Sequence, residues 1–362
     1  MSRVRLSTWL APAGSATLAG LLIALAPAPA LAHEKWFTDR AVHPTDWSLV
    51  LSGRTALALG AAAAALGVFA VAQRLTGDPH WPRLPIYQRM ARGDMTLVGV
   101  QTAITLIYMG VRLTLPAPQL ALPGAPAAGG AGAAGPWAAV GYALAALEIA
   151  VAFSFITGVL DRAGALALLA LGLPVLVLFS PIDLLEQAHY AAVAVAVLLA
   201  GASGEVARPR PPRGIAWEVV WGARGVAASR ILTGIALLSA ALADKVWNPD
   251  LGAAFLTERP GFNVFRLLGV GVADDTFVLV VGAIETAIGA LLIAGLLTRV
   301  VILVMLVPFN LTVPFLPAEE MIGHLPLFGL MYLLLVHGAG AAAAAAVADA
   351  SAAKGGITDE HQ

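Results

Sequence analysis

Long apolar stretches dominate this chain of 362 residues. A run of about 20 apolar residues is long enough for a helix to cross the hydrocarbon core of a bilayer. The hydrophobic fraction is 59% and the charged fraction only 12%, whereas soluble domains carry about 25% charged residues. We therefore predict an all-α, polytopic membrane helix bundle with about nine spans after an N-terminal signal peptide. The predicted spans lie near 48–72, 94–115, 137–159, 164–180, 185–201, 224–244, 275–297, 299–316 and 324–346.

Charge and cysteine content exclude several functions. The net charge of −1 argues against nucleic-acid binding, since that function needs a basic face to neutralise phosphates. The chain has no cysteine, so it has no disulfide framework, thiolate metal site or cysteine nucleophile. No nucleotide-binding or hydrolase motif is visible. Any redox chemistry would need a bound cofactor or a partner protein.

The N-terminus has the anatomy of a secretory signal peptide. Residues 1–32 have a basic start, an apolar centre and the small-residue sequence Ala30-Leu31-Ala32, as at a cleavage site. Cleavage there would leave His33 as the first residue. The alternative is an uncleaved first membrane helix.

Arginines in alternating loops predict the orientation of the chain. Positive residues in short loops stay on the cytoplasmic side. We therefore expect an inner (plasma) membrane protein with its mature N-terminus outside and its C-terminus in the cytoplasm. The arginines that follow the first, third, fifth and seventh spans are Arg74, Arg83, Arg89 and Arg92, then Arg162, then Arg208, Arg210, Arg213 and Arg224, and then Arg299.

Two stretches share a spacing of charged residues. The separation between Glu148 and Arg162 equals that between Glu285 and Arg299 (162 − 148 = 299 − 285). Arg92 precedes Arg230 by nearly the same separation as Glu148 precedes Glu285. We therefore predict two parallel four-helix repeats with a cleft between them. The predicted units are a signal peptide (1–32), an outer segment with an extra span (33–91), repeat 1 (92–201), a cytoplasmic linker (202–223), repeat 2 (224–347) and a cytoplasmic tail (348–362).

Glu148 and Glu285 are the main candidates for chemistry. Each lies well inside an apolar helix, where a charged carboxylate is costly. Each must therefore be protonated, paired with a cation or exposed to a wet cavity. One interpretation is an acid that handles protons, and the other is a buried acid that ties two helices together.

Histidines and cations form the second group of candidates. His189 and His324 open the last span of each predicted repeat and follow acidic residues, so they are candidate proton relays or weak metal ligands. Alternatively, the acids only stabilise the helix starts. Arg230 would snorkel to the cytoplasmic surface or reach toward Glu285, and Lys245 ends its helix on the outside. We consider both as orienting cations at a bound cofactor.

The predicted mature N-terminus suggests a metal hypothesis. A free amine and imidazole at His33, with His43 as a third donor, are nitrogen ligands that suit copper.

The second predicted repeat resembles the DoxX family of four-helix membrane proteins. The resemblance rests on Arg230-x3-Gly234, Lys245, Glu285-x3-Gly289-x5-Gly295-x2-Thr298-Arg299 and His324-Leu325-Pro326. The first repeat carries the pattern weakly, with Asp161-Arg162 in place of Thr298-Arg299. The resemblance implies a membrane subunit of a quinone-linked redox system that works with a periplasmic or membrane oxidoreductase subunit, with quinone as its cofactor.

Three functions follow as hypotheses. In the leading one, Glu285 and Glu148 carry protons, His324 and His189 relay them at the outer face, and quinone chemistry supplies the redox step. A transporter of ions or small solutes also fits parallel repeats with intramembrane carboxylates. The third is a structural or assembly subunit without an activity of its own.

Overall fold

The computed structural model describes residues 42–77, 79, 82, 84–117, 120–121, 138–201, 217–312 and 318–340. Within these ranges the secondary structure is helical, apart from an isolated bridge between Thr114 and Ala121. The predicted signal peptide, His33, the linker core (202–216) and the predicted tail lie outside the described residues.

All nine predicted stretches contain helix. Six segments are long and apolar enough to cross a membrane, and they occupy α2 (Gly53–Thr76), α4 (Asp94–Arg112), α5 (Ala138–Thr157), α6 (Asp161–Ala170) together with α7 (Gly172–Leu178), α10 (Trp217–Ala241) and α13 (Asp274–Ala294). Shorter apolar segments lie in α9 (Ala188–Ala200), α14 (Thr298–Thr312) and α15 (Ala318–His337). The structure thus confirms an all-helical protein with six candidate membrane-spanning helices.

Short elements lie at the two ends of the bundle. The end where α4, α6 and α14 begin, here called the Arg299 end, carries α3 (Pro85–Arg92). The opposite end, here called the Trp247 end, carries η1 (Trp47–Leu51), α8 (Pro181–Glu186), η2 (Leu242–Val246), α11 (Pro249–Glu258), η3 (Pro260–Phe262) and α12 (Val264–Leu267).

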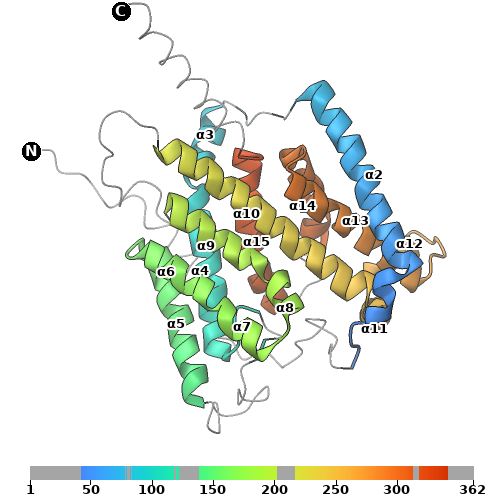
Figure 1. The fold of residues 1–362 in the computed structure, drawn as a ribbon, viewed down its shortest axis with the longest axis horizontal. Coiled ribbons are helices and arrows are strands. Elements are labelled where there is room, and N and C mark those ends of the chain that lie inside the picture. The colour runs from blue at the N-terminus through green and yellow to red at the C-terminus, as the bar shows by residue number, and fades with distance from the viewer. Residues whose placement is uncertain are drawn as a thin grey trace, which may run out of the picture.

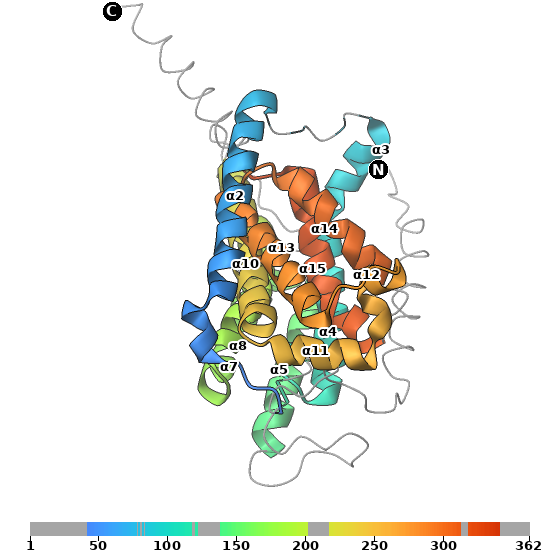
Figure 2. The same cartoon turned by 90° about the vertical axis from the view of Figure 1, so that its right-hand side faces the viewer.

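Eight helical segments form a closed ring. Each segment contacts the next in the order α4, α5, α6, α9, α10, α13, α14 and α15, and α15 packs back on α4. Figures 1 and 2 show this bundle, with α2 along one side. A large core cluster with residues from α4, α5, α6, α9, α13, α14 and α15 fills the interior. The ring therefore buries one side of each helix and leaves the other for lipid.

Helix α2 packs outside the ring, against α13. Its start is attached at the Trp247 end, where Arg54 forms an ion pair with Asp275 at 2.9 Å. Trp247 Nε1 donates to Thr55 Oγ1 at 3.0 Å. The first span therefore lies outside the ring.

Several backbone landmarks recur at one fixed distance along the chain. Left-handed backbone occurs at Gly158 and Gly295 (295 − 158 = 137), at Leu160 and Leu297, and at Gly201 and Gly338. The pairs Leu160/Leu297 and Gly201/Gly338 have the same offset (297 − 160 = 338 − 201 = 137). A leucine with positive φ is uncommon. Because the leucine recurs at the same offset as the glycines, the connection between α5 and α6 is built like the connection between α13 and α14.

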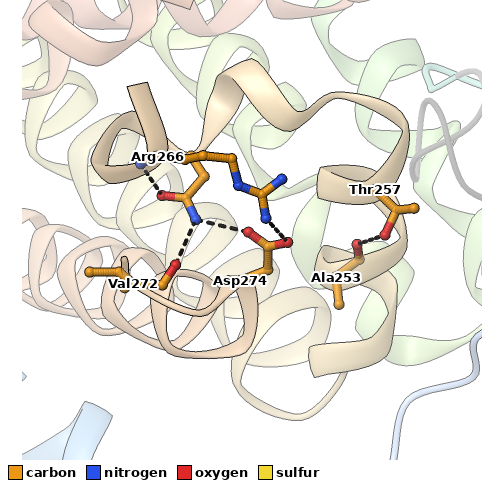
Figure 3. Close-up of polar contacts among 6 residues, drawn as sticks. Ala253, Thr257, Arg266, Val272 and Asp274 are labelled. Carbon is orange, nitrogen blue, oxygen red and sulfur yellow. Dashed lines mark hydrogen bonds and ion pairs between the residues drawn. The ribbon is translucent and has the colours of Figure 1, made fainter. Parts of the chain in front are cut away.

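A folded segment covers one part of the Trp247 end. The segment α11–α12 is joined to the start of α13 by a polar network drawn in Figure 3. Asn263 Nδ2 donates to Asp274 Oδ1 at 2.8 Å and to the Val272 carbonyl at 3.3 Å. Arg266 Nη2 donates to Asp274 Oδ2 at 2.7 Å. These bonds fix the segment that precedes α13.

Candidate functional site

Three pairs of residues from the DoxX-like pattern meet along the α10–α13 contact. The first pair is Arg230 and Gly295. The Arg230 guanidinium donates to the carbonyls of Leu292 and Ile293 at the end of α13. A Cβ on Gly295 would lie 2.8 Å from this guanidinium. Arg230 is 8% exposed, so it neither snorkels to the surface nor reaches Glu285. It caps a neighbouring helix.

The second pair is Gly234 and Gly289. A Cβ on Gly234 would lie 2.7 Å from the Gly289 carbonyl oxygen, and a Cβ on Gly289 would lie 2.9 Å from the Gly234 carbonyl oxygen. The two backbones are therefore in direct contact, as small residues allow at helix crossings in membranes.

The third pair is Lys245 and Glu285. Lys245 Nζ lies 2.8 Å from Glu285 Oε2, and the two side chains are 30% and 33% exposed. Lys245 lies in the π-helical turn η2, which follows α10. Glu285 is thus paired with a cation, one of the outcomes expected for it. Its carboxylate lies level with the Trp247 end of α10.

Removal of the lysine tests this pair. We expect Lys245→Met to lower the free energy of unfolding by about 1 kcal/mol, since a partly exposed ion pair contributes little more. The double variant Lys245→Met/Glu285→Gln should recover most of this loss because no carboxylate is left without the lysine. Thermal unfolding in detergent, followed by tryptophan fluorescence, measures both. An equal loss in the double variant would show that the pair is not the cause.

The predicted counterparts Arg299 and Arg162 differ in role. Arg299 donates to the carbonyls of Leu335, Val336 and Pro79 at 3.0, 2.7 and 2.7 Å. Its guanidinium would touch a Cβ on Gly338, at 2.7 Å. At the matching joint of α6 and α9, Asp161 Oδ2 lies 3.2 Å from a Cβ built on Gly201. At this joint Asp161 therefore lies against the end of α9, whereas Arg162 is exposed.

Glu148 has a different environment from Glu285. Its side chain is 0% exposed. Neither carboxyl oxygen has a hydrogen-bond partner within the described part of the chain. The position that precedes Lys245 by the landmark offset (245 − 108 = 137) holds Tyr108 in place of a lysine. Glu148 packs against the last turn of α4, where a Cβ on Gly110 would lie 3.4 Å from its Oε2.

Tyr190 lies near Glu148 and lines a cavity. Its side chain is 5% exposed. It also lines a cavity of about 230 Å³ between α6, α7, α8 and α9. The lining is apolar apart from Tyr190 and Gln187; the other lining residues include Leu168, Leu171, Val175, Leu184 and Ala191. Sequence reasoning missed Tyr190, whose only signal was a tyrosine one position after His189.

The two candidate histidines have unrelated surroundings. The His189 ring lies 4.4 Å from the Tyr190 ring, and its Nδ1 lies 3.2 Å from the Glu186 carbonyl oxygen. The His324 ring packs edge-on against Phe309 at 5.5 Å. The offset between the two histidines (324 − 189 = 135) is two less than that of the backbone landmarks, so the histidines are out of register with them. His189 packs on Tyr190, whereas His324 packs on Phe309.

The described residues contain no group of three or more His, Asp or Glu side chains that could hold a metal. His43 contributes its backbone, since its carbonyl accepts a hydrogen bond from Asn248 Nδ2 at 2.7 Å. The suggested copper ligand His33 lies outside the described ranges.

Another polar pair lies at the Arg299 end. His337 Nε2 contacts Asp94 Oδ2, and Asp94 is 7% exposed. Tyr332 interacts electrostatically with Asp94. Neither residue was among the site residues predicted from the sequence. The pair joins the first helix of the ring to the last.

The chain matches no protein-family model, no curated protein and no solved structure. Family membership is therefore not shown, and the DoxX-like resemblance rests on the residues quoted above.

Proposed function

We propose that this protein is an integral membrane subunit of a quinone-linked redox system, with a lipid-soluble quinone bound in the cavity beside Tyr190. The observation that carries this proposal is the position of Tyr190, which lines an apolar cavity and lies near the buried Glu148. Ligand sites typically combine apolar walls with a few polar groups.

The cavity residues fit the chemistry of a quinone ring. Leucine and valine side chains offer apolar walls, while Tyr190 and Gln187 offer a hydroxyl and an amide for the ring oxygens. The volume of about 230 Å³ is below the range of about 300–1,000 Å³ for whole drug-sized ligands. It suits a ring whose tail remains in the bilayer, beside the exposed Leu169 and Leu185.

The protein residues would act as follows. A bound quinone supplies electron acceptance coupled to proton uptake. Tyr190 holds the ring by a hydrogen bond and passes a proton along it. Glu148, buried and without a hydrogen-bond partner among the described residues, stores the proton because the neutral acid suits an apolar site. His189, packed on Tyr190, exchanges protons with solvent at the Trp247 end.

The contrast between the two glutamates supports this assignment. Glu285 is held by Lys245, so its charge is compensated and it has a structural explanation. Glu148 has no such partner in the described chain. We therefore assign the proton-carrying role to Glu148 and a helix-joining role to Glu285.

The recurring landmarks support a duplicated architecture. We infer that α4–α9 and α10–α15 are two copies with the same membrane orientation, because the landmark offset is shared by Glu148 and Glu285 (285 − 148 = 137) and by the left-handed residues. The contacts also repeat, since α4–α5 corresponds to α10–α13 and α9–α10 to α15–α4. The arginine distribution favours the Trp247 end outside.

Quinone affinity tests the proposal. We expect purified protein in nanodiscs to bind a short-tailed quinone, and Tyr190→Phe to weaken binding about tenfold, the equivalent of one hydrogen bond. Ala191→Phe should abolish binding by filling the cavity. Tyr142→Phe, an exposed tyrosine on α5, is the matched control and should bind as the unmodified protein does. Equal affinities for all these proteins would contradict the proposed site.

A further inference from the structure

Helix α4 carries a polar stripe along the face that meets α15. Asp94, Gln101, Thr105, Tyr108 and Arg112 follow one another at spacings of seven, four, three and four residues. Residues with this spacing lie on one face of a helix. From Asp94 to Arg112 the stripe rises about 27 Å at 1.5 Å per residue, close to the thickness of the hydrocarbon core of about 30 Å. We call this set of five residues the α4 stripe.

Contacts show that the stripe faces α15. Asp94 meets His337 at the Arg299 end. A Cβ on Gly329 would lie 2.8 Å from Gln101 Oε1. Thr105 Oγ1 donates to the Ile322 carbonyl at 2.6 Å, and Tyr108 packs in one cluster with Ile322.

Proline creates part of this polarity. Pro326 lies inside α15 and has no N–H, so it cannot donate to the carbonyl four residues earlier. That carbonyl belongs to Ile322, and Thr105 supplies the missing donor. A hydroxyl and a main-chain carbonyl are thus brought together in the middle of the α4–α15 contact.

Unsatisfied oxygens lie beside these groups. Gln101 Oε1 and Thr102 Oγ1 are buried without a hydrogen-bond partner in the described chain, and Thr102 is 0% exposed. Buried polar atoms of this kind usually bind water. In a membrane interior the cost of leaving them unsatisfied is especially high.

The stripe is absent from the corresponding contact of α10. At the landmark offset after Asp94, Gln101 and Thr105, the sequence has the apolar residues Ile231, Leu238 and Leu242, whereas after Tyr108 it has Lys245. The α10–α9 contact also has a polar bond, from Ser229 Oγ to the Ala192 carbonyl at 2.8 Å, so the two contacts differ in where their polar residues lie.

We propose that the α4–α15 contact is a proton-conducting path across the membrane, in which Asp94 and His337 exchange protons at the Arg299 end. Water held by Gln101, Thr102 and Thr105 carries the proton along the stripe. Chains of Asp and His residues with hydrogen-bonding groups serve this purpose in membrane proteins. Each proton released at the Trp247 end is replaced by one taken up at the Asp94–His337 pair, so the side chains end unchanged. This path does not depend on quinone binding.

Other charged and titratable groups surround the entry pair. Tyr332 of α15 interacts electrostatically with Asp94. Arg299 of α14 binds the carbonyls of Leu335 and Val336, which directly precede His337. The guanidinium therefore positions the end of α15 and adds a positive charge near the pair.

Proton flux into liposomes tests the proposal in the absence of quinone. Purified protein is reconstituted with an internal pH-sensitive dye, and a potassium gradient with valinomycin drives proton entry. We expect flux above that of protein-free liposomes, and Asp94→Asn and Gln101→Leu to lower it about tenfold or more because they interrupt the relay. Thr105→Val should also lower the flux, whereas Thr105→Ser keeps the hydroxyl and should preserve it.

Thr233→Val is the matched control. Thr233 is 0% exposed on α10, and its hydroxyl has no hydrogen-bond partner among the described residues, but it lies outside the α4 stripe. Its flux should stay within about twofold of the unmodified protein, since the path on α4 is intact. Flux equal to that of protein-free liposomes would overturn the proposal. An equal loss in Thr233→Val and Gln101→Leu would also overturn it, because the effect would then reflect general destabilisation.

Discussion

Gly289→Val is expected to reduce the yield of folded protein severely. A Cβ at this position would lie 2.9 Å from the Gly234 carbonyl oxygen and 2.9 Å from the Leu238 backbone nitrogen. Both neighbours are backbone atoms, which cannot move aside as a flexible side chain can. A valine would therefore force α10 and α13 apart, at a cost of about 3 kcal/mol or more.

Gly60→Val provides the control for this prediction. Gly60 lies in α2, and a Cβ there would have no atom within 4 Å. The same substitution should therefore leave the unfolding temperature and the yield nearly unchanged. Size-exclusion profiles and thermal unfolding in detergent measure both variants. Equal behaviour would mean that the two helices do not touch at Gly234 and Gly289.

Arg299→Leu is expected to have the second largest effect. The guanidinium satisfies two carbonyls at the end of α15 and the carbonyl of Pro79. Its loss removes the guanidinium donor from these oxygens. It also removes the bonds that join α14 to the end of α15 and to Pro79. We expect a loss of about 3 kcal/mol in stability, since a hydrogen bond to a charged donor contributes about 1.5–3 kcal/mol.

Arg162→Leu tests whether the effect comes from the contacts of Arg299 or would follow from the loss of either predicted counterpart. Arg162 is the predicted counterpart at the landmark offset (299 − 162 = 137), but its side chain is exposed. We expect its substitution to change the unfolding temperature little. Comparable losses in the two variants would contradict the assigned capping role of Arg299.

Hydropathy and glycine content were enough to predict much of the fold. Nine apolar stretches predicted helices, and helices are present in all nine, six of them with the length and hydropathy of membrane spans. The pattern Arg230, Gly234, Lys245, Glu285, Gly289 and Gly295 also indicated residues that belong together. In the structure these six residues form three contacts between α10 and α13.

The candidate site was less accessible from the sequence. Glu148 was identified because an acid in an apolar helix is conspicuous. Its neighbour Tyr190 lies in α9, and the sequence alone does not place α9 beside Glu148. The offset between His189 and His324 is two residues shorter than the landmark offset. The spacing between the two histidines did not show how the two predicted repeats align along the sequence. The left-handed residues, by contrast, share one offset.

The α4 stripe shows a signal that was present but unused. Its residues follow the regular spacing of one helix face, and Pro326 indicated a free carbonyl in α15. What the sequence did not contain was the identity of the opposing helix. Only closure of the ring places α15, the last helix, against α4, the first.

The most direct test of the central claim is photoaffinity labelling with an azido-quinone, followed by mapping of the labelled peptides. If quinone binds beside Tyr190, saturable label should fall on residues that line the cavity, which are Pro116 and residues within 168–191, and Ala191→Phe should remove it. Label confined to the α10–α13 contact, or label that excess unlabelled quinone does not displace, would contradict the proposed quinone site.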